Sequence, residues 1–170
     1  MNQAASDHDF RDDHALLDAW AAIVTPTLRA IRTLGDELEA KVGLPMAEAE
    51  VLLRLYRAPS RRLPTTHLAR ELLFTSGGFT KLADRLEAQV LVARQPCATD
   101  RRITFLTLTP HGRALAQKTL KAHAAGIRRH VLSHTGAEAL AQWRATATLI
   151  HDESAAALHP TGRRGTQSTP

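Results

Sequence analysis

Between Thr65 and Leu108 the spacing of apolar residues changes from helical to strand-like, and few folds contain that order of elements. The segment begins with the helical pattern "THLARELL" and continues with "TSGGFTKLADRLE", whose apolar residues recur at helical spacing. Residues 90–96 and 102–108 then alternate between apolar and polar on either side of a short polar connection. Two short helices followed by a β-hairpin predict a helix-turn-helix with a wing.

The rest of the chain is expected to be helical. Aromatic residues make up only 4% of the chain while hydrophobic residues make up 44%, so Leu, Ala, Val and Ile must supply the core. The predicted fold is therefore mainly α with a small β-hairpin. A winged helix-turn-helix domain is expected over 44–109. One helix is expected before it, over 12–43 with a kink or restart near Pro26, and further helices after it, over 110–158. Residues 1–11 are expected to be flexible and 159–170 disordered.

Within the predicted winged domain, three details are expected at the junctions. Thr65 is expected to cap the first short helix, Leu63 to contribute one strand residue before it, and Pro96 to close the first strand of the hairpin. Alternation places Leu106 on one face of the second strand and Phe105 on the other.

Gly77 and Gly78 stand at the head of an otherwise good helix, where each weakens helix formation by up to about 1 kcal/mol relative to alanine. They could cradle a phosphate ligand or let the backbone approach a large surface. The chain contains neither G-x-x-x-x-G-K-[ST] nor G-x-G-x-x-G, which argues against a nucleotide loop. Small residues at a helix N-terminus would let that end of the helix approach a polyanion such as DNA.

The distribution of charge also favours DNA. Residues 1–60 carry 6 Lys and Arg against 10 Asp and Glu, whereas residues 61–113 carry 9 against 4. An acidic start followed by a basic middle is typical of a chain that meets a polyanion through its middle, although an ordinary solvated surface is the alternative.

Candidate DNA contacts lie on the second short helix and the hairpin. Arg85 is expected to read guanine and Lys81 to contact phosphate, while the alternative for Arg85 is a surface ion pair with Asp84 or Glu87. The full set expected to bind DNA is Thr65, Thr75, Ser76, Gly77, Gly78, Thr80, Lys81, Arg85, Arg94, Arg101 and Arg102.

Two acids are expected to support the wing. Asp84 would repel phosphate, so we expect it to pair with an arginine of the wing. At the predicted hairpin tip, "DRR" places Asp100 beside Arg101 and Arg102, so that one arginine can enter a minor groove while the acid holds the other by an ion pair.

The combination of "TSGGFTKLADRLE", "DRR" and "LTPHGRAL", in that order and spacing, resembles the MarR family of bacterial winged-helix regulators from about Leu44 to Leu120. The resemblance implies a homodimer whose first and last helices intertwine, with a wing on each side that binds double-stranded DNA at a pseudo-palindromic operator. It also implies repression relieved by a small aromatic or phenolic effector bound between the dimerisation helices and the winged domain. Val90 departs from the family pattern, which has a helix-ending glycine there, so we expect the helix to end differently.

The sensing residues are less defined by the sequence. Trp20 is the candidate effector-binding residue. The resemblance includes a subgroup that senses urate-like molecules through a tryptophan at this position. That subgroup also uses an arginine one turn later, where this chain has Val24. The alternative for Trp20 is packing in the core or dimer interface. Cys97, the single cysteine, raises the alternative of a thiol-based redox sensor, although no second cysteine is present to resolve it.

Other classes of protein are disfavoured by the sequence. No nucleophile–base pair, carboxylate pair or metal cluster can be assembled from residues expected to lie together, so we expect no enzyme activity, no cofactor and no metal site. No apolar run is long enough to cross a membrane, and the polar, acidic N-terminus is unlike a secretory signal, so a cytoplasmic location is expected. The remaining alternative is a winged-helix protein-interaction module without DNA binding.

Overall fold

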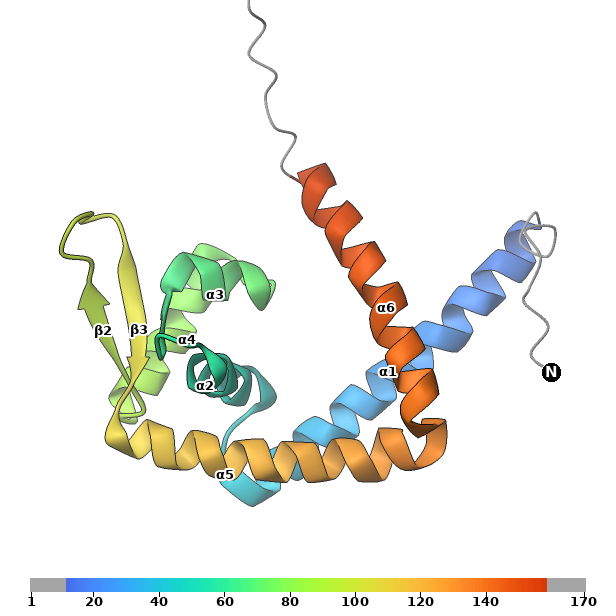
Figure 1. Cartoon of the computed structure of the whole chain (residues 1–170), viewed down its shortest axis with the longest axis horizontal. Helices are drawn as coiled ribbons and strands as arrows, with labels where there is room; N and C mark the ends of the chain where they lie inside the picture. Colours follow the sequence, from blue (N-terminus) through green and yellow to red (C-terminus); the bar gives the residue numbers. More distant parts are fainter. Residues whose placement is uncertain (1–11, 159–170) are drawn as a thin grey trace, which may run out of the picture. The chain divides into compact units, whose positions relative to one another are not determined.

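The computed structural model describes residues 12–158. The segments 1–11 and 159–170, expected to be flexible and disordered, lie outside the described residues. The chain divides into two compact units between His130 and Val131. In chain order the elements are α1 (Asp13–Val42), α2 (Met46–Arg57), β1 (Arg62–Pro64), α3 (Thr65–Glu71), α4 (Ser76–Ala88), β2 (Val92–Pro96), β3 (Thr104–Leu108), α5 (Pro110–Ile127), the π-helical turn η1 (Arg128–Leu132) and α6 (Ser133–Leu158) (Figure 1).

The predicted mainly α fold with a winged helix-turn-helix is confirmed. Helices α3 and α4 follow each other directly, and the β2–β3 hairpin projects beside them (Figure 1). Strand β3 pairs with both neighbours, giving an antiparallel sheet of order β1-β3-β2 in which Leu63 faces Leu106 and Arg94 also faces Leu106. The strand expected only at Leu63 is thus a three-residue strand that completes the sheet.

The core of the first unit is built mainly from leucine, as the composition required. Its largest fully buried side chains come from α1, α2, α3, α4, the link between α4 and β2, and the sheet: Leu38, Leu52, Leu55, Leu68, Leu82, Leu86, Leu91 and Leu106 among others. The apolar face predicted for α4 is buried, with Phe79, Leu82, Ala83 and Leu86 at most 3% exposed. This packing leaves the opposite face of α4 to solvent.

One helix start and one helix interior differ from expectation. Helix α3 is preceded by Pro64 without a side-chain cap, so Thr65 is its first helical residue rather than its cap. Helix α1 passes through Pro26 without interruption, so the restart expected there is not observed. The carbonyl that loses its helical partner to Pro26 belongs to Ala22, which is exposed and can bind water, and the Thr27 hydroxyl donates to the Ile23 carbonyl oxygen (2.6 Å).

Helix α4 ends as a glycine-ended helix does, although Val90 stands at the position of the glycine and a different end was expected. The N–H of Leu91 donates to the Leu86 carbonyl (2.9 Å), and the N–H of Val90 donates to the Glu87 carbonyl (2.9 Å). This Schellman arrangement is the one that a glycine normally makes, and Val90 adopts the left-handed conformation it needs (φ 57°). The helix therefore ends in the glycine manner at the cost of backbone strain in a β-branched residue.

The "LTPHGRAL" motif joins the sheet to α5. The Thr109 hydroxyl accepts the N–H of Gly112 (2.9 Å) as the helix N-cap, and Pro110 occupies the first turn. A Cβ atom at Gly112 would lie 1.8 Å from the Leu91 carbonyl oxygen, so only glycine allows α5 to start this close to the strand. The motif therefore fixes where α5 leaves the winged domain.

Helices α1 and α5 are also held at their far ends. A Cβ atom at Gly126 would lie 2.9 Å from Leu34 Cδ2, which shows how closely α5 passes over α1. Glu37 accepts hydrogen bonds from Arg129 and from His130, whose Nε2 lies 2.7 Å from Glu37 Oε1. The hydrogen bond from His130 is the main cause that lowers the pKa of Glu37.

The second unit is largely α6, which is interrupted at Gly136 by non-helical backbone (φ 77°, ψ 167°). Its apolar side chains are substantially exposed, including Trp143 at 40% and Leu149 at 68%. Within residues 12–158, no helix is long and apolar enough to cross a membrane.

Candidate nucleic-acid interface

The two glycines at the head of α4 have different surroundings. Thr75 is the N-cap, and its hydroxyl accepts the Gly78 N–H (3.1 Å). A Cβ atom at Gly77 would meet nothing within 4 Å, whereas one at Gly78 would lie 3.0 Å from Thr75 Oγ1 and 3.4 Å from Phe74 Cδ1. A side chain at Gly78 would therefore press on the N-cap hydroxyl and on Phe74, whereas one at Gly77 would meet no other part of the described chain.

The outer face of α4 presents small and polar groups next to this helix start. Ser76, Gly77, Thr80 and Lys81 are all exposed, and Thr75 is exposed beside them. The Thr80 hydroxyl donates to the Ser76 carbonyl (2.9 Å), so it can still accept a hydrogen bond. Thr65, at the start of α3, is half-buried. A surface with free N–H groups at a helix start, hydroxyls and one lysine suits a phosphate backbone.

Arg85 has a partner that the sequence did not indicate. Its Nε donates to Glu48 Oε1 of α2 (2.9 Å), and Gln89 Nε2 donates to Glu48 Oε2 (3.2 Å). Glu48 is 3% exposed, so its carboxylate depends on these donors. The expected alternative partners, Asp84 and Glu87, are wrong for Arg85. Its side chain is still 57% exposed, and its Nη1 lies 3.5 Å from the Lys81 carbonyl oxygen of the same helix.

Arg94 connects the wing to α4. It pairs with Asp84 (2.7 Å) and with Glu87, and its backbone N–H donates to Glu87 Oε1 (3.2 Å). The ion pair expected between Asp84 and a wing arginine is therefore present. Arg94 itself was expected to contact DNA, but two carboxylates occupy its guanidinium group, so its role in the structure is to fix the first wing strand against α4.

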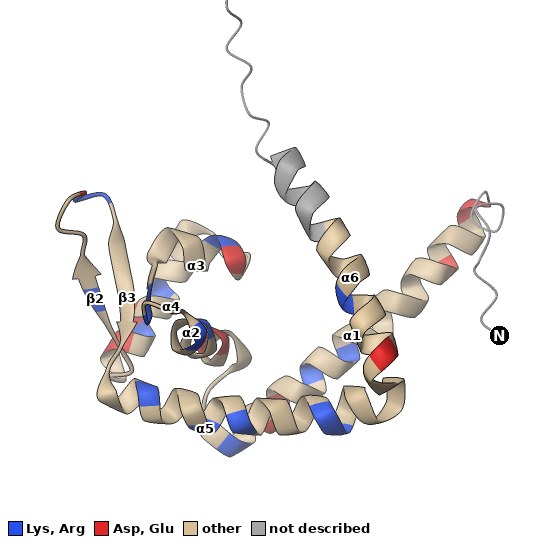
Figure 2. Ribbon diagram, viewed as in Figure 1, with Lys and Arg blue, Asp and Glu red and all other residues tan. Residues whose placement is uncertain are grey.

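The tip of the wing is basic, as Figure 2 shows for the β2–β3 hairpin, and Arg101 and Arg102 are exposed there. Asp100 does not form the expected ion pair among the described residues. Its Oδ1 accepts the backbone N–H of Arg102 (2.9 Å), and its carbonyl accepts the N–H of Ile103 (3.0 Å). The acid shapes the turn because a short carboxylate next to a turn satisfies backbone donors more readily than a long arginine side chain.

Cys97 lies directly after β2 and is half-buried. Its sulfur is 3.4 Å from Thr99 Oγ1, and hydrogen bonding with the Thr99 side chain is the main cause that lowers the pKa of the thiol. Trp20, the candidate effector-binding residue, is 55% exposed on α1. Within residues 12–158, no group of three or more His, Cys, Asp or Glu side chains is placed to hold a metal ion.

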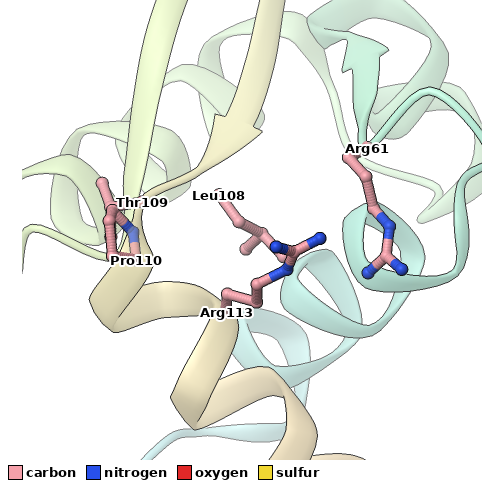
Figure 3. A pocket seen from close by; sticks show the side chains of 5 residues that line it. All are labelled: Arg61, Leu108, Thr109, Pro110 and Arg113. Atoms are coloured by element: carbon pink, nitrogen blue, oxygen red, sulfur yellow. The ribbon is translucent and has the colours of Figure 1, made fainter.

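Two cavities border the winged domain on the side of α5, and the sequence indicated neither. One, of about 390 Å³, lies where β3 passes into α5, and Arg61 and Arg113 line it together with Leu108, Thr109 and Pro110 (Figure 3). The Arg61 guanidinium also lies 4.9 Å from the centre of the Tyr56 ring. The other cavity lies between α2 and α5. Both bring together residues distant in sequence, which is why no local motif marks them.

Comparisons with known proteins agree with this geometry. A family model described as "MarR family" matches residues 42–103. The chain is 33% identical over 102 residues to the HTH-type transcriptional regulator MhqR of Bacillus subtilis strain 168, which covers 58% of this chain and 69% of the relative. The crystal structure of AbsC, a MarR family transcriptional regulator from Streptomyces coelicolor, has a TM-score of 0.69 at 26% identity and covers 89% of this chain and 97% of that one.

A second crystal structure is that of Sco3205, a MarR family transcriptional regulator from Streptomyces coelicolor in complex with DNA. Its TM-score is 0.71 at 25% identity, covering 84% of this chain and 90% of that one. The fold and the exposed face of α4 thus define a winged helix-turn-helix protein. The chain belongs to the MarR family, whose members are transcriptional regulators and not enzymes.

Proposed function

We propose that this chain is a transcriptional repressor that binds a pseudo-palindromic operator as a homodimer and is released by a small aromatic or phenolic effector. The observation that carries DNA binding is the solvent-facing start of α4, where Gly77 has no intramolecular steric role and Ser76, Thr80 and Lys81 lie beside it. The DNA-bound relative Sco3205 supports the same use of the fold. A location in the cytoplasm follows from a DNA target.

In this proposal α4 enters the major groove and the hairpin tip reaches the neighbouring minor groove. Lys81 contacts phosphate, and Arg101 or Arg102 enters the minor groove. Arg85 presents its terminal nitrogens to base edges while Glu48 fixes its Nε. Arg94, Asp84 and Glu87 hold the wing at the angle that allows both contacts.

The proposed dimer uses the helices outside residues 44–109, namely 12–43 and 110–158. Six large apolar side chains of α1 are about half exposed or more. Exposure of so much apolar surface to water is unfavourable in free energy, and such patches usually mark an interface. The six residues of this stripe are Leu16, Leu17, Trp20, Ile23, Leu28 and Ile31. A second copy of the chain would cover this stripe and would place two α4 helices about one helical turn of DNA apart, ~34 Å. Trp20 then lies at the dimer interface as well as at the proposed effector site.

The test is a fluorescence anisotropy titration of the DNA upstream of the chain's own gene at several salt concentrations. Removing one phosphate contact should lower the slope of log K against log salt by about 0.9. We expect this change for Lys81→Ala. Lys118→Ala removes the same charge from the exposed side of α5 and is the matched control. Equal slopes for the two variants would refute the assigned face, and no binding by the unmodified chain would favour a protein-interaction module instead.

A further inference from the structure

The turn between α3 and α4 carries an apolar side chain that the chain itself does not bury. Leu73 is 93% exposed, more than any other large apolar residue in the described part of the chain. Its neighbours Leu72 and Phe74 are half-buried and pack against the core of the first unit. The Phe74 ring meets the Phe79 ring edge-on, with 6.4 Å between their centroids. The turn is therefore anchored on both sides of Leu73, whose own side chain is left in solvent.

Leu73 also has a backbone conformation that leucine rarely adopts. Its φ is 56°, in the left-handed region. The Phe74 N–H donates to the Ala69 carbonyl (2.8 Å). The Leu73 N–H donates to the Arg70 carbonyl (3.1 Å), which completes a Schellman end for α3. Glycine is the usual residue at this position, and in the turn of a helix-turn-helix, because it has no Cβ atom to strain there.

Leucine at this position costs stability without a compensating gain within the chain. A side chain that is 93% exposed buries almost no apolar surface, so glycine would relieve the strain and lose no packing. Strained residues that persist are found mainly at functional sites. Strain alone does not mark such a site, since Val90 has a similar φ of 57° at the other end of α4. The position of Leu73 in the fold distinguishes the two residues.

Leu73 stands next to the surface assigned to DNA. It precedes the N-cap Thr75 by two residues, so the Cα atoms of Leu73 and Thr75 are at most about 7.6 Å apart. The exposed residues Ser76 and Gly77 follow directly. A duplex that receives the start of α4 therefore passes within reach of the Leu73 side chain. Val90 follows the far end of α4, about 20 Å from this start at 1.5 Å per helical residue.

We propose that Leu73 is an apolar DNA contact, which packs against the wall of the groove that receives α4. This inference rests on the proposed function and adds a contact of another kind to it, since the other residues assigned to DNA are small, polar or basic. The apolar surfaces that a duplex offers there are thymine methyl groups and the deoxyribose rings at the edge of the groove. A thymine methyl would make Leu73 a determinant of operator sequence, whereas a deoxyribose would add affinity for any sequence.

The test compares matched substitutions at the two left-handed positions in fluorescence anisotropy titrations of the upstream DNA. Leu73→Ala keeps the backbone strain and removes the apolar side chain, so it should weaken DNA binding at least about tenfold in a dimer with two such contacts. Leu73→Met keeps an apolar side chain of similar volume and should bind within about twofold of the unmodified chain. Val90→Ala removes exposed apolar atoms from the same conformation and should leave DNA binding unchanged.

Leu73→Gly separates the DNA contact from a structural role of the side chain. Relief of the strain should raise the melting temperature by roughly 1–4 °C in a chain of this size, while DNA binding should weaken as it does for Leu73→Ala. Lower melting temperatures for both Leu73→Gly and Leu73→Ala would show that the side chain serves the fold, and would overturn the proposal.

Replacing every thymine of the upstream DNA with deoxyuridine identifies the apolar partner once Leu73→Ala has shown weaker binding. If Leu73 packs on a thymine methyl group, the loss of the methyl groups should weaken binding by the unmodified chain more than binding by Leu73→Ala. Equal weakening of the two proteins assigns the contact to deoxyribose.

The outcomes distinguish this inference from the proposed function. Binding by Leu73→Ala equal to that of the unmodified chain would overturn the inference and leave the proposed function standing. Equal weakening by Leu73→Ala and Val90→Ala would also overturn it, because the loss would then not depend on the start of α4. If the unmodified chain binds no DNA, the proposed function fails and this inference fails with it.

Discussion

Replacing Arg85 with alanine should lower the free energy of unfolding, separately from any effect on DNA recognition. Glu48 is 3% exposed and keeps its charge in the core with two donors, Arg85 Nε at 2.9 Å and Gln89 Nε2 at 3.2 Å. Without Arg85, the carboxylate has only Gln89. Removing one partner of a buried ion pair costs about 3–5 kcal/mol. Because the Arg85 side chain is 57% exposed, water can enter the space it leaves, and we expect about 2–3 kcal/mol.

The assay is urea denaturation monitored by circular dichroism on four proteins: the unmodified chain, Arg85→Ala, Glu48→Gln and the double variant. Glu48→Gln makes the buried group neutral and should itself cost less than Arg85→Ala. The double variant should therefore be more stable than Arg85→Ala alone, which is a non-additivity that only a direct interaction gives. A free energy of unfolding for Arg85→Ala within about 0.5 kcal/mol of the unmodified chain would refute the reasoning.

The same four proteins separate stability from recognition. The double variant keeps α4 folded without presenting a guanidinium group to the groove. We expect it to bind DNA with less discrimination among sequences, as the loss of a base contact predicts. If the double variant discriminates as the unmodified chain does, Arg85 serves only to neutralise Glu48.

Two further predictions concern the backbone. Val90→Gly should raise the free energy of unfolding by about 0.5–1 kcal/mol, because relief of left-handed strain exceeds the entropy that glycine adds to the unfolded chain; an unchanged or lower value in urea denaturation would contradict the strain at φ 57°. Gly112→Ala should destabilise by about 3 kcal/mol, because its Cβ would overlap a backbone oxygen that no rotamer change can remove; the chain melting at its usual temperature would contradict that close approach.

The winged domain could be predicted from sequence because its signals are local. Phe79, Leu82 and Leu86 mark one helix face by spacing alone, and strict alternation around Leu106 marks the second wing strand. Asp84 could be assigned to a wing arginine because a carboxylate is unfavourable next to phosphate. These inferences needed no knowledge of which elements pack together.

The ion-pair partners could not be predicted in the same way. Arg85 meets Glu48, 37 positions earlier in the chain, and the only sign of this was an acid on the otherwise apolar inward side of α2. Arg94 was expected to contact DNA because it is basic and lies in the wing, yet two acids of α4 bind it. Such pairs depend on the distance between elements, which local patterns do not contain.

Two departures from the usual backbone rules also could not be predicted from the sequence. The rule that a left-handed helix end needs glycine failed at Val90, since the hydrogen bonds of Val90 and Leu91 to α4 and the strand that follows fix the conformation. The rule that proline breaks a helix failed at Pro26, where the affected turn is exposed to water. The cavity between α2 and α5 was missed because its walls come from two helices far apart in the sequence.

The central claim is that the start of α4 seats in a groove of DNA, and Gly77 tests it most directly. Gly77→Leu should stabilise the helix by up to about 1 kcal/mol, since its Cβ meets nothing within 4 Å in the chain. Ala88→Leu adds bulk at the exposed far end of the same helix and is the matched control. In anisotropy titrations of upstream DNA, with thermal melting of each protein, we predict at least about tenfold weaker binding for Gly77→Leu at undiminished stability, and unchanged binding for Ala88→Leu. Binding by Gly77→Leu equal to that of the unmodified chain would contradict the account.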